Sequence, residues 1–236
     1  MATLRSLACA LGVVAAACSG PVPPADPDGA PPTRCVPPPG VSGSPRTIDE
    51  VVALIDALPA PVTLPCFLES LDRPLYVEAT ISRLSAQPAY GARSPRIFVF
   101  VGDLVLSVVP EGSGASLLEM GELTDTAMSR KAELELPIAT PVGASVPYDR
   151  VVYETGTVCG GCHYREVRDE SVDFARAYVS TALRPYDLDL VAIDRVRAEW
   201  LACRPDQEPD RCAMLEAIFG HGPVVHQRFP DAFPTL

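Results

Sequence analysis

The sequence predicts an α+β protein: an antiparallel β-sandwich or small barrel followed by a small helical C-terminal region. Between about residue 75 and residue 158, apolar residues recur at every second position in short runs separated by Gly, Pro and Ser. On either side of this region, apolar residues recur at the three- and four-residue spacing of amphipathic helices. A C-x-x-C-H run lies where the β pattern gives way to the second helical pattern.

The first expected element of the folded part is a short helix. Thr47 and Glu50 have the spacing of a capping box, in which the threonine begins a helix and the glutamate reaches back to it. Apolar residues follow at helical spacing until Pro59 ends the run. This helix is expected to cover one edge of the core.

Alternation of apolar and polar residues predicts the strands. On this ground strands are expected at 75–82 and 134–138. Runs that are mostly apolar on both faces predict buried strands at 96–101 and 104–109, and a further strand is expected at 151–154. Gly102 and Asp103 separate the second run from the third, which is typical of a hairpin, with a bulge as the alternative. Pro137 favours an edge position for the fourth strand, because proline cannot donate a ladder hydrogen bond.

The region after the C-x-x-C-H run is expected to be helical. Apolar stripes at helical spacing occupy 172–183, 193–203 and 212–219. Pro185 ends the first stripe and Gly220 ends the third.

The N-terminal segment predicts export and anchoring. Arg5 precedes an uninterrupted run of apolar and small residues that ends at Cys18 and is too short to span a bilayer. Ala15-Ala16-Ala17-Cys18 resembles the lipobox of bacterial lipoproteins, although ordinary signal cleavage nearby stays open. The resemblance implies lipidation of Cys18, and Ser19 after it implies an outer-membrane lipoprotein that faces the periplasm or the cell surface.

Four segments are expected along the chain. They are a signal peptide at 1–17, a lipid-anchored Pro-rich spacer at 18–46, a mainly β domain with a leading helix at 47–158, and a helical region with the C-x-x-C-H run at 159–236. The formal net charge of -11 argues against nucleic acid and against an anionic membrane face as partners. Membrane contact is therefore expected through the lipid anchor. Lys131 is the only lysine, which we attribute to GC-rich codon usage.

The remaining cysteines predict two disulfides. Of the eight cysteines, four are left once the signal, the anchor and the C-x-x-C-H run are set aside: Cys35, Cys66, Cys203 and Cys212. The turn-rich segment between Cys203 and Cys212 favours a local bridge there, with Cys35 joined to Cys66. Four cysteines allow three connectivities, so the other two pairings stay open.

Cys159-Gly160-Gly161-Cys162-His163 is the run that carries chemistry. Two thiols at this spacing can each form a thioether to a haem vinyl group, and the adjacent imidazole can then bind the iron. A disulfide between the two cysteines, structural or redox-active, and metal binding are the alternatives. No second C-x-x-C or H-x-x-x-H run completes a zinc ligand set.

These five residues resemble the haem-attachment motif of c-type cytochromes. The resemblance implies haem c bound through Cys159, Cys162 and His163, with His163 on the iron. The sixth iron ligand is open between three residues near the end of the chain, Met214, His221 and His226.

The function predicted is that of an envelope lipoprotein with one covalent haem. It would act in electron transfer, with a redox protein as partner, or as a haem-bearing subunit. The alternative is a disulfide-stapled binding or structural lipoprotein without haem. No recognisable hydrolase motif is present, so an electron carrier or a non-enzymatic role is favoured over a hydrolase or transferase.

Overall fold

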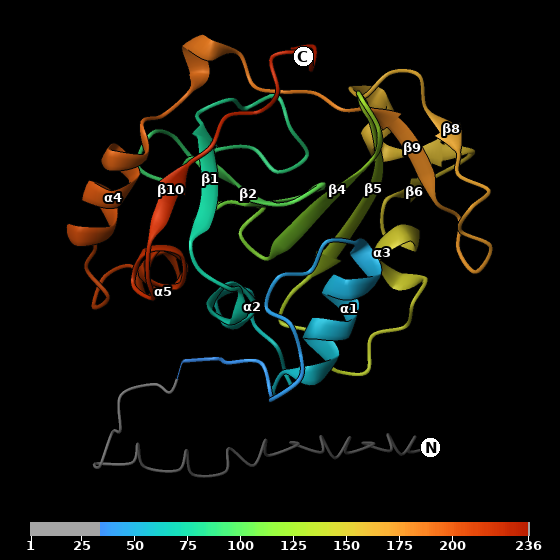
Figure 1. Cartoon of the computed structure of the whole chain (residues 1–236). Coiled ribbons are helices and arrows are strands. Elements are labelled where there is room, and N and C mark those ends of the chain that lie inside the picture. Colours follow the sequence, from blue (N-terminus) through green and yellow to red (C-terminus); the bar gives the residue numbers. More distant parts are fainter. Residues whose placement is uncertain (1–33, 236) are drawn as a thin grey trace, which may run out of the picture. The chain divides into compact units, whose positions relative to one another are not determined.

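A computed structural model describes residues 34–235, which contain one mixed eight-stranded sheet with helices packed against it (Figure 1). The strand order is β10-β1-β2-β3-β4-β5-β9-β8. These strands are β1 (Leu75–Thr80), β2 (Arg96–Val101), β3 (Leu104–Val108), β4 (Leu117–Asp125), β5 (Met128–Glu135), β8 (Val167–Arg168), β9 (Tyr178–Thr181) and β10 (Val224–His226). The predicted signal peptide and the lipidation site Cys18 lie outside the described residues.

Five helices and one small hairpin complete this part of the chain. The helices are α1 (Ile48–Ala57), α2 (Leu64–Ser70), α3 (Val146–Asp149), α4 (Ile193–Leu201) and α5 (Pro209–Phe219). The hairpin pairs β6 (Val152–Tyr153) with β7 (Gly156–Thr157). Short 3-10 turns occupy Val158–Gly161 and Asp187–Asp189. None of the helices within residues 34–235 has the length and apolar character needed to cross a bilayer.

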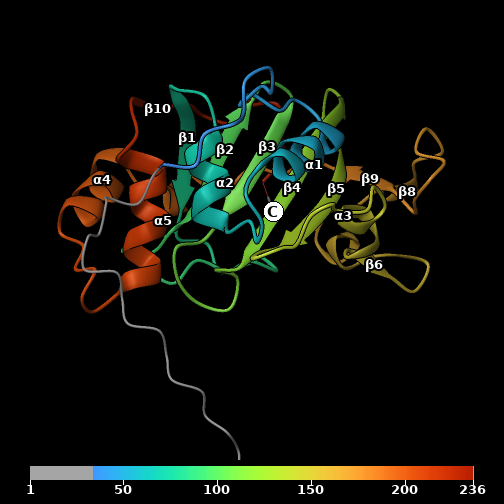
Figure 2. The same ribbon diagram turned by 90° about the horizontal axis from the view of Figure 1, so that it is seen from below.

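The α+β class is confirmed, and the arrangement of the strands differs from the sandwich or barrel that was expected. All the long strands belong to one open sheet, and helices α1 and α2 cover one of its faces where a sandwich would have a second sheet (Figure 2). The outer edge of β1 is paired in parallel by β10, which comes from the end of the chain. A helical layer can bury the apolar face of the sheet as completely as a second sheet would.

Helix α1 begins as the sequence predicts. The Thr47 hydroxyl accepts a hydrogen bond from the Glu50 amide at 3.1 Å, and the Glu50 carboxylate accepts one from the Arg46 amide at 2.6 Å. Thr63 caps α2 in the same way through the Cys66 amide, at 3.2 Å. Both helices therefore have defined first turns, and their buried faces contribute to the main core.

The two faces of the sheet differ in character because successive side chains of a strand point to opposite sides. The helix-covered face carries residues of the main core, such as Leu106, Leu118 and Leu134, all fully buried. On the same strands, the intervening Ser107 and Glu119 lie on the other face. That second face is mixed in polarity, and the segments after β7 cover it.

The end of the chain adds an aromatic cluster to this second face. The Phe229 ring packs edge-on against Phe98 and Phe100, with centroids 4.9 and 4.8 Å away. Glu78 lies beside this cluster with its side chain only 4% exposed, and one carboxylate oxygen accepts from the Phe229 amide at 3.2 Å. Burial raises the pKa of Glu78, against the opposing effect of that hydrogen bond and of the nearby His226 and Arg228 side chains.

The raised pKa of Glu78 predicts a pH-dependent effect of Glu78→Gln. Folded wild-type protein holds the proton to higher pH than the unfolded chain, so its free energy of unfolding falls as pH rises from about 4.3 through the raised pKa. Glutamine does not titrate, so the variant does not lose stability in this way as the pH rises. We expect the stability of the variant relative to wild type to increase between pH 4 and pH 8, as measured by chemical denaturation. Glu170→Gln, at a side chain 85% exposed, is the control, and equal pH profiles for both variants would contradict the expectation.

Two expectations for the region after β7 are wrong. Residues 172–183 form no helix; their second half is β9, in which Val179 pairs with Arg130 of β5. Partners distant in sequence override local periodicity here. The segment directly after the C-x-x-C-H run, which was expected to be helical, contains the short strand β8 instead, and the run itself begins in a 3-10 turn at Val158–Gly161. The helices predicted at 193–203 and 212–219 are present as α4 and α5.

The predicted disulfides are confirmed. Cys35 is joined to Cys66 at the start of α2, and Cys203 is joined to Cys212 between α4 and α5. The first bridge ties the end of the Pro-rich spacer to the helical layer.

Candidate functional site

The C-x-x-C-H residues are brought together by one tight turn directly after β7. The Thr157 hydroxyl accepts from the Gly160 amide at 3.2 Å and so caps the turn. The Cys159 carbonyl then accepts from the amides of Cys162 and His163, at 3.1 and 2.8 Å. The backbone therefore folds both thiols and the imidazole into one small region.

Glu166 fastens this turn from the far side of the motif. One of its carboxylate oxygens accepts from the Thr157 amide at 2.9 Å, and the other accepts from the Thr157 hydroxyl. This carboxylate fits because Gly160 has no side chain: a Cβ there would lie 2.7 Å from a Glu166 oxygen. A Cβ at Gly161 would meet nothing within 4 Å. Of the two motif glycines, only Gly160 lies against a neighbouring side chain, so a larger residue there would have to move Glu166.

Alanine at the two glycines is expected to give different results. Gly160→Ala must displace the Glu166 carboxylate from its charge-assisted hydrogen bonds, with an expected loss of about 1–3 kcal/mol in the free energy of unfolding. Gly161→Ala is expected to change it by less than about 0.5 kcal/mol. Chemical denaturation of the two variants side by side measures the difference, and equal losses would show that Glu166 does not hold the turn.

His163 is held in one tautomer. Its Nδ1 lies 2.8 Å from the Thr181 carbonyl oxygen, which can only accept, so Nδ1 carries the proton and Nε2 keeps its lone pair. Metal-binding histidines commonly have this arrangement, in which the second ring nitrogen donates to a fixed acceptor. Burial, aided by the charge on Lys131, lowers the pKa of His163 to about 4. The ring is therefore neutral and able to act as a ligand at neutral pH.

The two motif cysteines are the free cysteines of the described part of the chain. Cys159 is partly buried, and burial raises the pKa of its thiol to about 11. Cys162 is exposed. Catalytic thiol exchange needs a thiolate near neutral pH, so the raised pKa of Cys159 argues against a redox-active pair.

The thiol pKa predicts slow alkylation of Cys159. A pKa of about 11, against about 8.5 for an ordinary cysteine, lowers the thiolate fraction at pH 7.5 by a factor of roughly 300. In haem-free protein, we expect iodoacetamide to modify the exposed Cys162 well before Cys159, as followed by mass spectrometry. Faster labelling of Cys159 would restore the thiol-exchange interpretation.

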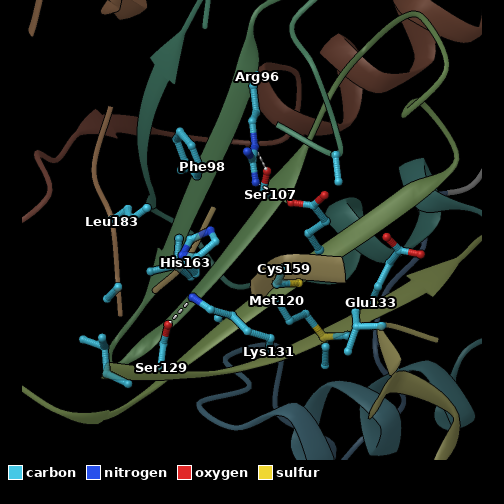
Figure 3. A pocket seen from close by; sticks show the side chains of 18 of the residues that line it. Arg96, Phe98, Ser107, Met120, Ser129, Lys131, Glu133, Cys159, His163 and Leu183 are labelled. Atoms are coloured by element: carbon cyan, nitrogen blue, oxygen red, sulfur yellow. Dashed lines mark hydrogen bonds and ion pairs between the residues drawn. The ribbon is translucent and has the colours of Figure 1, made fainter. Parts of the chain in front are cut away.

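Two adjoining cavities, of about 110 and 140 Å³, lie between the polar face of the sheet and the motif. Figure 3 shows the smaller one. His163 and Cys159 line both cavities, and Cys162 lines the larger. The sheet contributes charged and polar side chains from β2 to β5, and the covering segments contribute mostly apolar ones. The residues shared by the two linings include Arg96, Phe98, Glu119, Val158 and Leu183.

A hydrogen-bonded cluster organises the sheet side of the cavities. The Arg96 guanidinium donates to the Ser107 hydroxyl at 2.6 Å and pairs with the Glu119 carboxylate. Ser107 in turn donates to the Gln87 side-chain oxygen at 2.8 Å. Arg96 and Glu119 thus pair with each other on this wall.

Lys131 projects into the smaller cavity from β5. Its side chain is 7% exposed, and its amine donates to the Ser129 hydroxyl at 2.6 Å. Within residues 34–235 it forms no ion pair with a carboxylate. Burial lowers the pKa of Lys131 to about 8. A buried amine in such surroundings is a functional candidate.

No protein-family model, curated protein or solved structure matches the chain. The geometry of the site and the sequence motif therefore carry the functional argument.

The three residues predicted as alternatives for a sixth iron ligand lie away from both cavities. Met214 is 3% exposed in α5, within the helix-side core. His221 faces Glu69 at 3.5 Å, and His226 faces Glu78 at 3.7 Å. Among residues 34–235, no three His, Cys, Asp or Glu side chains are grouped so that they could hold a metal ion between them.

The sheet-side residues of the site, Arg96, Glu119 and Lys131, were not expected from the sequence. Each lies on the face of the sheet opposite the main core, and of the three only Arg96 falls within a strand that the sequence predicts. The usable signal was Lys131 itself, a single lysine in the chain placed at a strand position that alternates with core residues. Which residues cover that face depends on contacts between segments far apart in the sequence.

The site fits a covalently bound haem at the points of attachment. Both motif thiols are free, and His163 Nε2 has an available lone pair beside the cavities. The lining also offers apolar side chains, such as Phe98 and Leu183, next to polar ones. Typical cofactor pockets measure ~300–1,000 Å³, so the two cavities would not enclose the whole macrocycle in the described conformation.

Proposed function

We propose that the protein is an envelope lipoprotein that carries one c-type haem, bound through Cys159 and Cys162, with His163 as an iron ligand. The observation that carries the proposal is the state of the motif. Its cysteines stay free while the other four described cysteines form disulfides, and its histidine is fixed in the ligating tautomer. If the motif served only as a structural disulfide, the tautomer of His163 would have no role.

The thiols and the imidazole have separate roles at the site. The thiols hold the porphyrin, and the hydrogen bond from Nδ1 to Thr181 orients the imidazole and raises its basicity. When bound, haem supplies an iron that exchanges single electrons. We infer electron transfer to or from a redox protein, or service as a haem-bearing subunit, rather than hydrolysis or group transfer.

The anchoring part of the proposal rests on the lipobox-like sequence that ends at Cys18. Two or more acyl chains would hold the folded part at the outer membrane through the Pro-rich spacer. Labelling with a radioactive fatty acid tests this directly. Loss of label in Cys18→Ser supports the anchor, and an unlabelled wild-type chain rejects it.

Mass spectrometry of one peptide tests haem attachment. The full chain is exported in a host with haem-maturation machinery, and trypsin then releases residues 151–165, which contain the whole motif. We expect this peptide to carry the added mass of one haem in wild type and none in Cys159→Ala/Cys162→Ala. His226→Gln, outside the cavities, is the matched control and should keep the haem.

The same peptide distinguishes the alternative. A Cys159–Cys162 disulfide without haem in the exported wild-type protein would overturn the proposal in favour of a structural or binding lipoprotein. A haem stain on the denatured protein gives an independent readout, because only a covalent link survives denaturation.

A further inference from the structure

The smaller cavity, of about 110 Å³, has a buried amine and a buried hydroxyl in its lining. They belong to Lys131 and Ser129 of β5, which Figure 3 shows joined by a hydrogen bond at the cavity wall. The two side chains point to the same face of the sheet because they are two residues apart on one strand. A molecule in this cavity can therefore contact both polar groups at once.

Lys131 brings a positive charge to the lining that no carboxylate of the described chain balances. Arg96 pairs with Glu119 on the same wall. Glu133, which also lines the cavity, pairs with Arg150 at 3.0 Å. The Lys131 amine is 7% exposed, has a pKa of about 8 and is therefore mostly protonated at pH 7, yet within residues 34–235 it has only a neutral hydroxyl as partner. A buried charge without a counter-charge is costly, so a ligand that supplies one is favoured.

The amine and the hydroxyl both have hydrogen-bond donors left for a ligand. An ammonium group has three N–H donors, and Lys131 uses one of them on the Ser129 oxygen at 2.6 Å. The Ser129 hydroxyl has a proton of its own, which no side chain or carbonyl within residues 34–235 accepts. Gly121 pairs with Lys131 across the ladder, and a Cβ on it would lie 3.7 Å from the Ser129 hydroxyl oxygen. The side chain that Gly121 lacks therefore leaves space beside the two donors.

The apolar part of the lining sets the size and character of the rest of the ligand. It includes Phe98 and Val105 of the sheet, and Phe229 and Phe233 from the end of the chain. An apolar protein cavity of ~150 Å³ holds benzene, so this cavity admits a group of similar or smaller size, such as a short aliphatic chain or a single ring.

We infer that the smaller cavity binds a small monocarboxylate, with its carboxylate on the Lys131 amine and the Ser129 hydroxyl and its apolar tail on the aromatic side chains. A carboxylate supplies the missing negative charge and accepts from both donors. An anion with two charges fits less well, because its second charge would be buried without a cation. The inference goes beyond the proposed function and does not rest on it, since none of these contacts involves the motif residues.

Isothermal titration calorimetry of the full chain, produced without haem-maturation machinery, tests the inference. Butanoate, hexanoate and benzoate are compared at pH 7 with butanamide, hexanamide and benzamide, their neutral counterparts. We expect saturable binding of an acid that its amide does not match. Lys131→Met should weaken that binding by about ten- to a hundredfold, because it removes a hydrogen bond to a charged group.

Arg195→Met is the matched control, since it removes an exposed cation of α4 that lines neither cavity, and it should leave the affinity unchanged. Three results would each overturn the inference: no saturable binding of any of the three acids, equal affinity for an acid and its amide, or unchanged affinity in Lys131→Met.

A second measurement needs no substitution and so does not depend on whether Lys131→Met folds. Because Lys131 is the only lysine, lysine labelled with ¹³C at its Cε gives a single side-chain signal whose pH titration reports the pKa of this amine. Saturation with the acid should raise that pKa from about 8 to above about 9, because a bound carboxylate favours the charged amine. An unchanged titration at saturation would place the acid elsewhere. Haem attachment is read separately from the motif peptide, so the two proposals can fail independently.

Discussion

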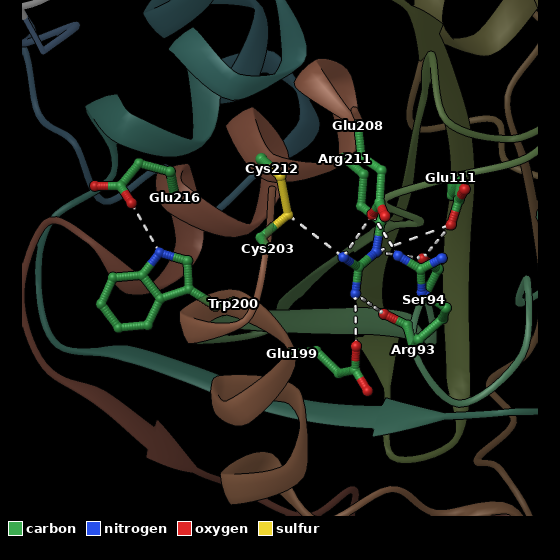
Figure 4. The surroundings of a disulfide bond; sticks show 10 residues. All are labelled: Arg93, Ser94, Glu111, Glu199, Trp200, Cys203, Glu208, Arg211, Cys212 and Glu216. Atoms are coloured by element: carbon green, nitrogen blue, oxygen red, sulfur yellow. Dashed lines mark hydrogen bonds and ion pairs between the residues drawn. A yellow bond between two sulfur atoms is a disulfide. The ribbon is translucent and has the colours of Figure 1, made fainter. Parts of the chain in front are cut away.

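Arg211→Ala is expected to lower the free energy of unfolding by about 3 kcal/mol. The Arg211 side chain is 3% exposed, and its guanidinium contacts the Glu199 and Glu208 carboxylates at 2.9 Å each and approaches Glu111 at 3.8 Å (Figure 4). It also donates to the Arg93 carbonyl at 2.7 Å. Alanine leaves three acidic groups close together without the cation that they share.

Arg93 provides the matched control for this prediction. It pairs with the same Glu208, but its side chain is 48% exposed, so water replaces the lost contact and Arg93→Ala should cost less than about 1 kcal/mol. Arg211→Lys keeps the charge without the planar fork and should fall between the two alanine variants. Urea denaturation at low ionic strength measures all three. Equal losses for the two alanine variants would show that burial of Arg211 adds nothing.

Phe67→Ala is expected to cost about 4 kcal/mol, because it leaves a cavity in the centre of the main core. Phe67 is fully buried in α2, the helix that packs against α5 and contributes to the main core. Phe174→Ala removes the same group from a ring that is 49% exposed and packs only its edge against Tyr148, so it should cost less than about 1 kcal/mol. Thermal and urea denaturation of both variants measure the difference. A cost for Phe67→Ala near that of Phe174→Ala would mean that the core collapses into the cavity.

Elements marked by local chemistry could be predicted from the sequence. The Thr47 hydroxyl caps the Glu50 amide, and the Glu50 carboxylate accepts from the amide of Arg46 just before the helix, so α1 begins where the pattern predicts. Gly102 and Asp103 similarly mark the turn between β2 and β3, and Gly102 adopts a positive φ of 64° there. In such cases every interaction that defines the element lies within a few residues.

Elements defined by distant partners could not be predicted in the same way. Val179 lies in an apolar stripe with helical spacing, yet it pairs with Arg130, far away in the sequence. The candidate site divides along the same line. The motif residues Cys159 to His163 are contiguous and could be recognised in the sequence. Lys131 and Arg96 join the site only because the segments after β7 fold over their face of the sheet.

The parallel pairing of β10 with β1 has a consequence for how the chain folds. Leu75 of β1 pairs with Val224 of β10, so the outer edge of β1 stays unpaired until β10 has been synthesised. Unpaired edges of apolar strands invite pairing with other chains, and contacts between such distant residues form slowly. Strand β10 thus protects the outer edge of β1 from pairing with other molecules, and a chain truncated before Val224 would leave that edge free to aggregate.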